Sequence, residues 1–206
     1  KKTGVGYLRQ TDWSGGAGQD LFVDETKYYT DDGYLDVYSS PGNIILEKVG
    51  SSYVESGELV SSVFDLGTAV RPIILAWEPL GQIGGDGTSS VRFQIAMSDT
   101  STPASWDYVG PDGTSGSYFL NDNYSVPESI GSHEYFRYKL FLRTDTETST
   151  PTISDFTTSY TTDCTPPGQA YFGNLSAESY LVRVSRAGYR TVEEPITISG
   201  DMLLSV

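Results

Sequence analysis

Hydrophobic and polar residues alternate along residues 132–162 in the manner of strands with one buried face. The apolar and aromatic members of the alternation are Phe136, Tyr138, Leu140 and Leu142. The intervening basic positions are Arg137, Lys139 and Arg143. We expect two antiparallel strands in this stretch that close a β-sandwich, because the apolar face needs a second sheet to cover it.

The same pattern recurs earlier in the chain. In VRFQIAM the residues expected to face inward are Val91, Phe93, Ile95 and Met97, and those expected to face outward are Arg92 and Gln94. Further strand candidates are NIILEKV, ELVSSVFDLG and RPIILAWEPL, each bounded by Gly, Pro, Asn or Asp. In the last of these segments, Ile73, Leu75 and Trp77 share one face.

Turn residues separate the remaining strand candidates. Residues 21–29 and 34–39 flank a turn at Asp31, Asp32 and Gly33. No window of ten or more residues combines a helical apolar stripe with an absence of helix breakers. The pattern therefore predicts an all-β chain, folded as a jelly-roll-like antiparallel β-sandwich with a small β-rich C-terminal unit.

Composition divides the chain into three parts. Residues 1–20 contain the Gly-rich run WSGGAGQ, which lacks the following helix that a phosphate-binding loop needs, so we expect a flexible leader there. Residues 21–162 carry the alternating segments and form the predicted sandwich. The run TTDCTPPGQ, residues 161–169, is typical of a linker.

Residues 163–206 are expected to form a small, incomplete unit. Its strand candidates are QAYFGNL, ESYLVRVSR and EEPITISGDMLLSV, with Tyr180, Val182 and Val184 on one face. Three strands bury little apolar surface on their own. We therefore expect a segment outside residues 163–206 to pair with the edge of this unit.

Composition and charge limit which classes of partner this chain can bind. The chain has 206 residues, 37% of them hydrophobic, which is enough for a sizeable core. A net charge of −14 argues against a nucleic-acid partner, because such a partner requires clustered basic residues. The single cysteine, Cys164, excludes a disulfide within the chain and leaves an intermolecular link or an inert thiol as alternatives.

No apolar run is long enough to span a bilayer, and no signal segment is present. We therefore expect a processed extracellular or cell-surface domain without a membrane segment in this chain.

The order ELVSSVFDLG, RPIILAWEP, VRFQIAMSD, WDYVGPDGT and YFRYKLFLRTDTETSTPTISDFTTSYTT resembles a discoidin or galactose-binding-like jelly roll over residues 57–162. The matching positions are Phe64, Trp77, Phe93, Trp106, Arg137 and Tyr138. The resemblance implies a two-sheet sandwich whose end loops bind a sugar, a lipid head group or another protein, often beside a structural calcium ion.

The tail NLSAESYLVRVSRAGYRTVEEPITISG is similar to the second half of a carboxypeptidase-regulatory-like, or transthyretin-like, domain. The combination of such a tail with a jelly roll resembles bacterial surface and type IV pilin-like proteins. This resemblance implies that the chain binds other copies of itself or other subunits of a surface assembly.

Two acidic stretches offer the oxygen ligands that calcium prefers. The first comprises Asp24, Glu25, Asp31 and Asp32, and the second comprises Asn121, Asp122 and Asn123. Neither stretch has the spacing of an EF-hand, so a solvated loop is the alternative to a structural calcium ion. We expect no other cofactor.

Three aromatic residues near the polar loop SDTSTPAS are candidates for binding a sugar ring: Trp106, Tyr108 and Tyr118. We expect them to rim one end of the sandwich, with core packing as the alternative for Trp106. Core packing is the favoured interpretation for Trp77, which alternates with apolar residues.

Catalytic motifs do not stand out. His133 is the single histidine, and the sequence contains neither GxSxG nor HExxH. We therefore predict a non-catalytic structural or adhesion subunit of a cell-surface or pilus-like assembly. A carbohydrate-binding module is the alternative, and a small glycan-active hydrolase, which would need two facing carboxylates, is a weaker one.

Overall fold

The computed structural model describes residues 4–79, 81–82, 90–120, 124–162, 176–184 and 192–198. Across these ranges the chain consists of antiparallel sheets and their loops, with one short 3-10 turn at Glu128–Ile130. The prediction of an all-β antiparallel fold is confirmed. None of the helical structure in the described ranges is long and apolar enough to cross a membrane.

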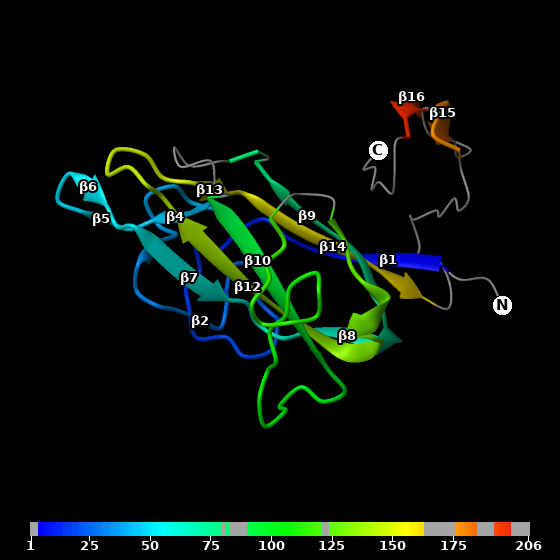
Figure 1. Cartoon of the computed structure of the whole chain (residues 1–206), viewed down its shortest axis with the longest axis horizontal. Helices are drawn as coiled ribbons and strands as arrows, with labels where there is room; N and C mark the ends of the chain where they lie inside the picture. The colour runs from blue at the N-terminus through cyan, green and yellow to red at the C-terminus, as the bar shows by residue number, and fades with distance from the viewer. Residues whose placement is uncertain are drawn as a thin grey trace.

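Two sheets make up most of the fold (Figure 1). The first, the β14 sheet, has the order β1 (Gly4–Gln10), β14 (Asp155–Thr162), β9 (Pro72–Glu78) and β11 (Tyr124–Ser125). The second, the β12 sheet, has the order β10 (Val91–Ser98), β12 (His133–Arg143), β7 (Ser56–Val60) and β2 (Thr30–Asp31), and β8 (Phe64–Val70) also pairs with β12.

Smaller sheets complete the described structure. A three-stranded sheet contains β13 (Thr152–Ile153), β4 (Ile44–Leu46) and β3 (Leu35–Asp36). One two-stranded sheet pairs β5 (Lys48–Val49) with β6 (Ser52–Tyr53), and another pairs β15 (Ser179–Val184) with β16 (Val192–Thr197).

Aromatic side chains join the two main sheets across the core. The ring of Phe93 in β10 lies 4.7 Å from that of Trp77 and 5.1 Å from that of Phe156, both in the β14 sheet. The ring of Tyr138 in β12 lies 4.1 Å from Phe156. These contacts make the arrangement that of a β-sandwich. All four residues predicted to face inward on β12 are buried.

Two residues predicted to face outward are covered rather than exposed. Arg137 and Gln94 are each only 4% exposed, although they lie on the outer face of the β12 sheet. The cover comes from segments that pack on this face, since Trp106 lies over Arg137 and the backbone of residues 115–117 lies over Gln94. The period-two pattern predicts which face a residue occupies, but not what else covers that face.

The structure contradicts the prediction that residues 1–20 form a flexible leader, for the part from Gly4 onward. β1 pairs with β14 along its full length. Trp13 is fully buried, and its Nε1 donates to Tyr138 Oη at 2.9 Å. Tyr138 Oη in turn donates to Gln10 Oε1 at 2.8 Å. The N-terminal segment is therefore part of the core.

The Gly-rich run forms a turn that holds the following segment. Gly15 N donates to Thr26 O at 2.9 Å, and Gly18 N donates to Tyr29 O at 3.0 Å. The prediction of a strand over residues 21–29 is wrong, because these residues turn back against the Gly-rich run and form only isolated bridges, Lys27 with Gly16 and Leu21 with Val63. Of residues 34–39, only Leu35–Asp36 is a strand.

The C-terminal hairpin is the described part of the predicted small unit. β15 and β16 pair with each other over six residues each. Tyr180 and Val182 are half-buried and Val184 is exposed. The predicted linker, from Asp163 onward, and Cys164 lie outside the described residues. Pairing of this unit by an outside segment stays a prediction.

Candidate functional site

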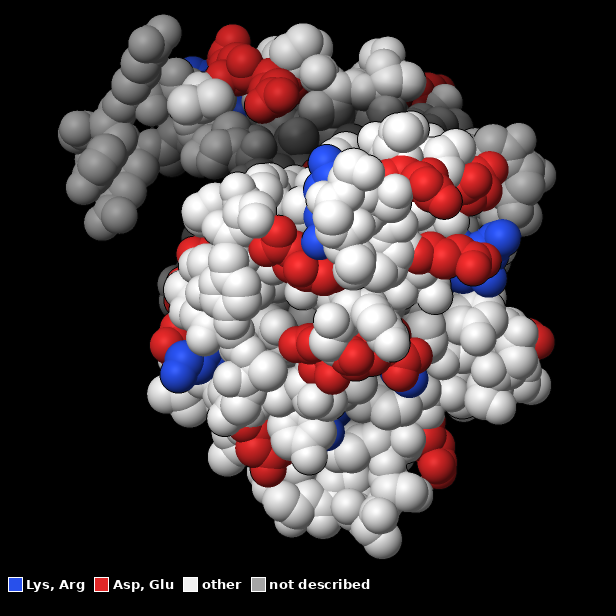
Figure 2. All heavy atoms as spheres, turned by 90° about the vertical axis from the view of Figure 1, so that its left-hand side faces the viewer, with Lys and Arg blue, Asp and Glu red and all other residues white. Residues whose placement is uncertain are grey.

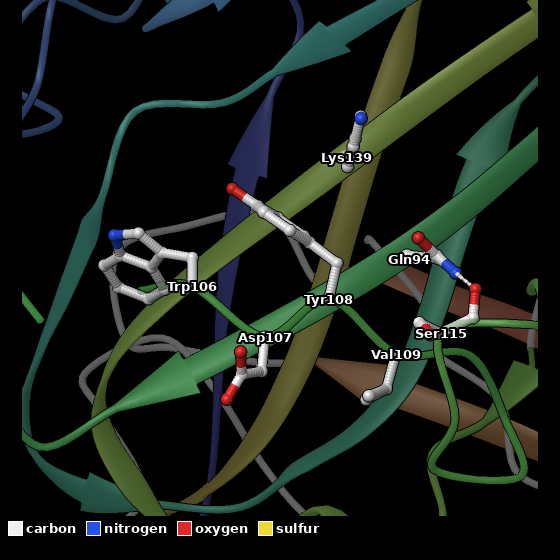
Figure 3. Close-up of a pocket in the computed structure, with 7 residues that line it drawn as sticks. All are labelled: Gln94, Trp106, Asp107, Tyr108, Val109, Ser115 and Lys139. Atoms are coloured by element: carbon white, nitrogen blue, oxygen red, sulfur yellow. Dashed lines mark hydrogen bonds between the residues drawn. The ribbon is translucent and has the colours of Figure 1, made fainter. Parts of the chain in front are cut away.

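A hollow of about 460 Å³ lies on the outer face of the β12 sheet (Figure 3). Gln94 of β10 and Lys139 of β12, which are register partners, line it from the sheet. The loop after β10 contributes the remaining lining residues: Trp106, Asp107, Tyr108, Val109 and Ser115. This hollow, the Trp106 hollow, contains two of the three aromatic residues predicted to bind a sugar.

Backbone hydrogen bonds fix the loop against the edge of β10. Val109 and Ile95 exchange two such bonds, of 2.9 and 3.0 Å. Phe119 and Phe93 exchange another two, also of 2.9 and 3.0 Å. The loop therefore continues the sheet at two points, which hold residues 106–108, just before the first point, and Ser115, between the two, over the outer face of the sheet.

A tight turn between these two points shapes the rim of the hollow. Gly110 N donates to Thr114 O at 3.0 Å, and a Cβ at Gly110 would clash with the backbone of Ser117, so only glycine fits there. The carboxylate of Asp112 accepts hydrogen bonds from Thr114 and from the Ser117 hydroxyl. These bonds lower the pKa of Asp112.

Arg137 supports Trp106 from below. Its guanidinium carbon lies 5.3 Å from the centre of the Trp106 ring and 4.1 Å from that of Tyr29, within the range of cation–π attraction. Arg137 Nε donates to Ser61 O at 2.8 Å, and Nη2 lies 3.3 Å from Asp20 Oδ1. The buried charge is therefore compensated, and the half-buried Trp106 ring has a fixed support.

Tyr108 presents its ring to the hollow and directs its hydroxyl into the protein. Figure 3 shows the ring between Trp106 and Lys139, while Asp107 points away from both aromatic residues. The hydroxyl is buried and makes no hydrogen bond of standard geometry with the described residues. Burial raises the pKa of Tyr108 to about 12, against the opposing effect of the nearby Arg137 charge. Tyr108 is therefore neutral at physiological pH.

Polar side chains complete the walls of the hollow. Gln94 Nε2 donates to Ser115 O and to Ser117 O, both at 2.9 Å, which holds the amide in place. Lys139 Nζ lies 2.9 Å from Glu58 Oε1 on β7. A half-exposed aromatic pair with fixed polar neighbours can hold a flat, hydroxylated ligand by ring contact and hydrogen bonds.

Tyr118 lies on the same face of the sheet, outside the Trp106 hollow. Its ring meets Phe141 of β12 edge-on, with centroids 5.2 Å apart and an interplanar angle of 89°. Arg92 of β10 lies 5.7 Å from the Tyr118 ring. The three predicted aromatic residues thus share a sheet face, whereas the sequence had predicted the rim at one end of the sandwich.

Sequence reasoning missed the residues of the sheet itself that line the hollow. Gln94 and Lys139 were identified as outward-facing, and this alternation was the signal that could have placed them beneath a ligand. The loop contributors Asp107, Val109 and Ser115 had no such signal, because the bridges that bring the loop to β10 are not visible in a local pattern.

The carboxylates predicted to bind calcium belong to separate turns. Asp24 accepts hydrogen bonds from the backbone and hydroxyl of Thr26, and these bonds lower its pKa. Asp31 accepts from Tyr28 Oη and Gly33 N, both at 2.6 Å.

Asp32 accepts from Tyr34 N at 3.1 Å and Glu58 N at 3.0 Å, and burial raises its pKa. The Glu25 side chain is exposed. Among the described residues no three His, Cys, Asp or Glu side chains gather as a metal site, so the structure does not bring Asp24, Glu25, Asp31 and Asp32 together. Asn121, Asp122 and Asn123 lie outside the described residues.

His133 lies at a second, smaller hollow of about 200 Å³. Its Nδ1 is 2.8 Å from Asp99 Oδ1, an exposed pair at the start of β12. This hollow shares Asp107 and Val109 with the Trp106 hollow, and apolar side chains such as Met97 and Ile130 line it together with the polar Ser129 and His133.

Negative charge is spread widely over the surface. Figure 2 shows the end of the molecule that carries β5 and β6, where Asp and Glu are prominent and Lys and Arg are sparse. Near the Trp106 hollow, in contrast, Arg137 and Lys139 each lie beside a carboxylate. The hollow is thus close to charge balance within a strongly acidic chain.

The chain matches no protein-family model, no curated protein and no solved structure. The antiparallel sandwich architecture follows from the structure, and the likeness to galactose-binding-like jelly rolls remains one of sequence pattern. A functional assignment accordingly depends on the geometry of the Trp106 hollow.

Proposed function

We propose that this chain is a non-catalytic carbohydrate-binding module, displayed outside the cell as part of a surface protein. The observation that carries the proposal is the Trp106 hollow, where two aromatic rings and fixed polar side chains surround about 460 Å³ on one sheet face. This arrangement favours the carbohydrate alternative over a purely structural role.

The chemistry of a sugar ring matches the hollow. A pyranose has apolar faces that pack on aromatic rings and hydroxyl groups at its edge that hydrogen-bond to polar side chains. Trp106 and Tyr108 offer the rings, and Gln94 and Lys139 offer polar groups. Trp106 rests on Arg137 and Gln94 is held by the loop, so little side-chain freedom would be lost on binding.

The same features support a binding role over glycan hydrolysis. A glycosidase acts through two carboxylates that face each other across the sugar. Asp107 is the one carboxylate among the described residues that line the Trp106 hollow, and it points away from Trp106 and Tyr108. Aromatic contact without a carboxylate pair is the arrangement expected of a binding module.

A role in surface assembly is the second candidate, and the C-terminal hairpin favours it. Leu181, Val184 and Val192 on β15 and β16 are 62%, 50% and 44% exposed. A two-stranded hairpin with exposed apolar side chains is suited to packing against another subunit. Light scattering tests this role: a concentration-dependent dimer or polymer would support it, and a monomer at all concentrations would oppose it.

A glycan array followed by calorimetry tests the carbohydrate proposal. We expect the chain to bind a defined set of glycans, and Trp106→Ala to weaken that binding at least about tenfold through the loss of ring contact. Tyr7→Ala, which removes an exposed tyrosine from the β14 sheet, is the matched control and should bind normally. Binding that is equally strong in Trp106→Ala would refute the assigned site.

A further inference from the structure

We propose that the ligand is a neutral, linear oligosaccharide that runs along the outer face of β12, from the Trp106 hollow to a second platform formed by Tyr118 and Phe141. This inference rests on the proposed carbohydrate-binding function and extends it by naming the charge and the length of the ligand. It requires that the two aromatic sites lie on one continuous surface.

Strand geometry provides that continuity. Arg137, Lys139 and Phe141 are alternate residues of β12, so their side chains leave the same face of the sheet. Arg137 supports Trp106, Lys139 lines the hollow, and Phe141 meets Tyr118. Four residues of strand span about 13 Å, which exceeds the length of one pyranose ring. A ligand that uses both platforms must therefore contain several sugar units.

Lys139 connects the two platforms. Its side chain lines the Trp106 hollow, and its ammonium nitrogen lies 5.0 Å from the centre of the Phe141 ring. Glu58 on the neighbouring strand β7 holds that nitrogen at 2.9 Å. A polar group fixed between two aromatic sites is well placed to hydrogen-bond the hydroxyls of a sugar that bridges them.

The exposure of the second platform suits a ligand surface. Tyr118 and Phe141 are both half-buried, and their edge-on contact holds each ring in a defined orientation. Two half-buried rings that already touch lose little conformational freedom when a ligand packs on them. The platform can thus add affinity to binding at Trp106.

Charge along this surface argues for a neutral ligand. Arg137 and Lys139 are paired with Asp20 and Glu58, and the charge of Arg92 beside Tyr118 is offset by that of Asp107 at the hollow, so the face has little net charge to offer an ionic ligand. The chain as a whole carries −14, which repels an anionic polysaccharide at long range. An uncharged ligand needs no ionic partner on this face and is not repelled by the net charge of the chain.

Calorimetry with oligosaccharides of different length tests the inference. The probes are neutral cello-, xylo- and manno-oligosaccharides of about one, three and six units, with oligogalacturonides as the anionic series. We expect one neutral series to gain about tenfold or more in affinity as the chain lengthens, as one added aromatic contact would give. Tyr118→Ala should remove this gain and leave binding of the shortest ligand unchanged.

Phe141→Thr provides a second, independent variant, because a β-branched residue keeps the strand intact while removing the other ring. It should cause the same loss for long ligands. Affinity that does not depend on chain length, or a preference for the anionic series, would overturn this inference while leaving carbohydrate binding in place. A lack of binding to every series, with a glycan array also blank, would overturn both proposals.

Discussion

Tyr138 shows how single side chains tie distant parts of this chain together. Its hydroxyl accepts from Trp13 Nε1 and donates to Gln10 Oε1, while its ring packs on Phe156. Gln10 Nε2 in turn donates to the carbonyl oxygens of Glu25 and Lys27. A buried hydroxyl of this kind satisfies two polar partners that have no access to water.

Tyr138→Phe is therefore expected to lower the free energy of unfolding by about 2 kcal/mol, because it leaves the Trp13 and Gln10 groups without their buried partner. Urea unfolding at neutral pH measures the change. Tyr34→Phe, at an exposed tyrosine, is the control and should alter stability by less than about 0.5 kcal/mol. Equal stability of the two variants would show that the buried chain of hydrogen bonds contributes nothing.

Buried tyrosines also make stability depend on alkaline pH. Burial raises the pKa of Tyr108 to about 12 from an ordinary value of 10.0. It also raises the pKa of Tyr28 and Tyr138. Above about pH 10 the unfolded chain releases phenolic protons that the folded chain keeps, so their contribution is complete below pH 10 and is lost as the pH rises toward the folded pKa.

We expect the urea midpoint of the unchanged chain to decrease between pH 9 and pH 11. The midpoint of Tyr108→Phe should decrease less over the same interval, because this variant lacks one of the buried phenol groups. Tyr108→Phe should also retain glycan binding, because the ring rather than the buried hydroxyl faces the hollow. Tyr108→Ala, which removes the ring as well as the hydroxyl, should lose glycan binding. Stability that is flat through pH 11 would rule out the proposed pH dependence.

At the level of elements, the N-terminal segment explains why local patterns predicted some of this fold and not all of it. The strands β9, β10, β12 and β14 follow from period-two alternation and turn residues. Residues 13–20 carry no such pattern, and the strand predicted for residues 21–29 is absent. The fold of this segment depends on bonds to distant partners, such as Trp13 to Tyr138 and Phe22 N to Val63 O. Sequence periodicity holds no information about such distant partners.

The candidate site, too, was predictable from the sequence only in part. Trp106, Tyr108 and Tyr118 were predictable as aromatic residues beside a polar loop, and their outward partners Gln94 and Lys139 were predictable from alternation. Their assembly on one sheet face was not predictable, because it requires the bridges of Val109 to Ile95 and Phe119 to Phe93.

The Gly-rich run offers a test of this tertiary role. A Cβ at Gly15 would clash with Thr26 Oγ1 and would lie 2.8 Å from Lys27 Cγ and 3.0 Å from Thr26 O, so Gly15→Ala must displace residues 26 and 27. We expect a loss of about 1–3 kcal/mol of stability, as for other overpacked sites. In Gly116→Ala the nearest atom is 3.8 Å away, and thermal unfolding should show little change. A flexible leader would instead tolerate both substitutions equally.

At the level of the whole molecule, the two packed sheets provide a rigid base, and the loop after β10 converts one outer face into a candidate binding surface. Net charge acts at the same scale. With −14 on 206 residues, self-repulsion opposes the compact state at low ionic strength.

Raising sodium chloride from about 10 to 300 mM should therefore increase the thermal midpoint, because salt screens that repulsion. Affinity for a neutral oligosaccharide should change less than about twofold over the same range, since no charge pairing with the ligand is involved. Calorimetry and thermal unfolding in matched buffers measure both quantities. Binding that weakens strongly with salt would instead indicate a charged ligand.

The three tryptophans provide the decisive measurement, because they occupy different environments in one chain. Trp13 and Trp77 are buried in the core, whereas Trp106 lies at the hollow. Titration with neutral oligosaccharides, followed by the indole ¹H–¹⁵N resonances, should shift the Trp106 signal and leave the Trp13 and Trp77 signals in place. A ligand that binds without moving the Trp106 resonance, or no binding across the neutral series, would contradict a carbohydrate site at Trp106.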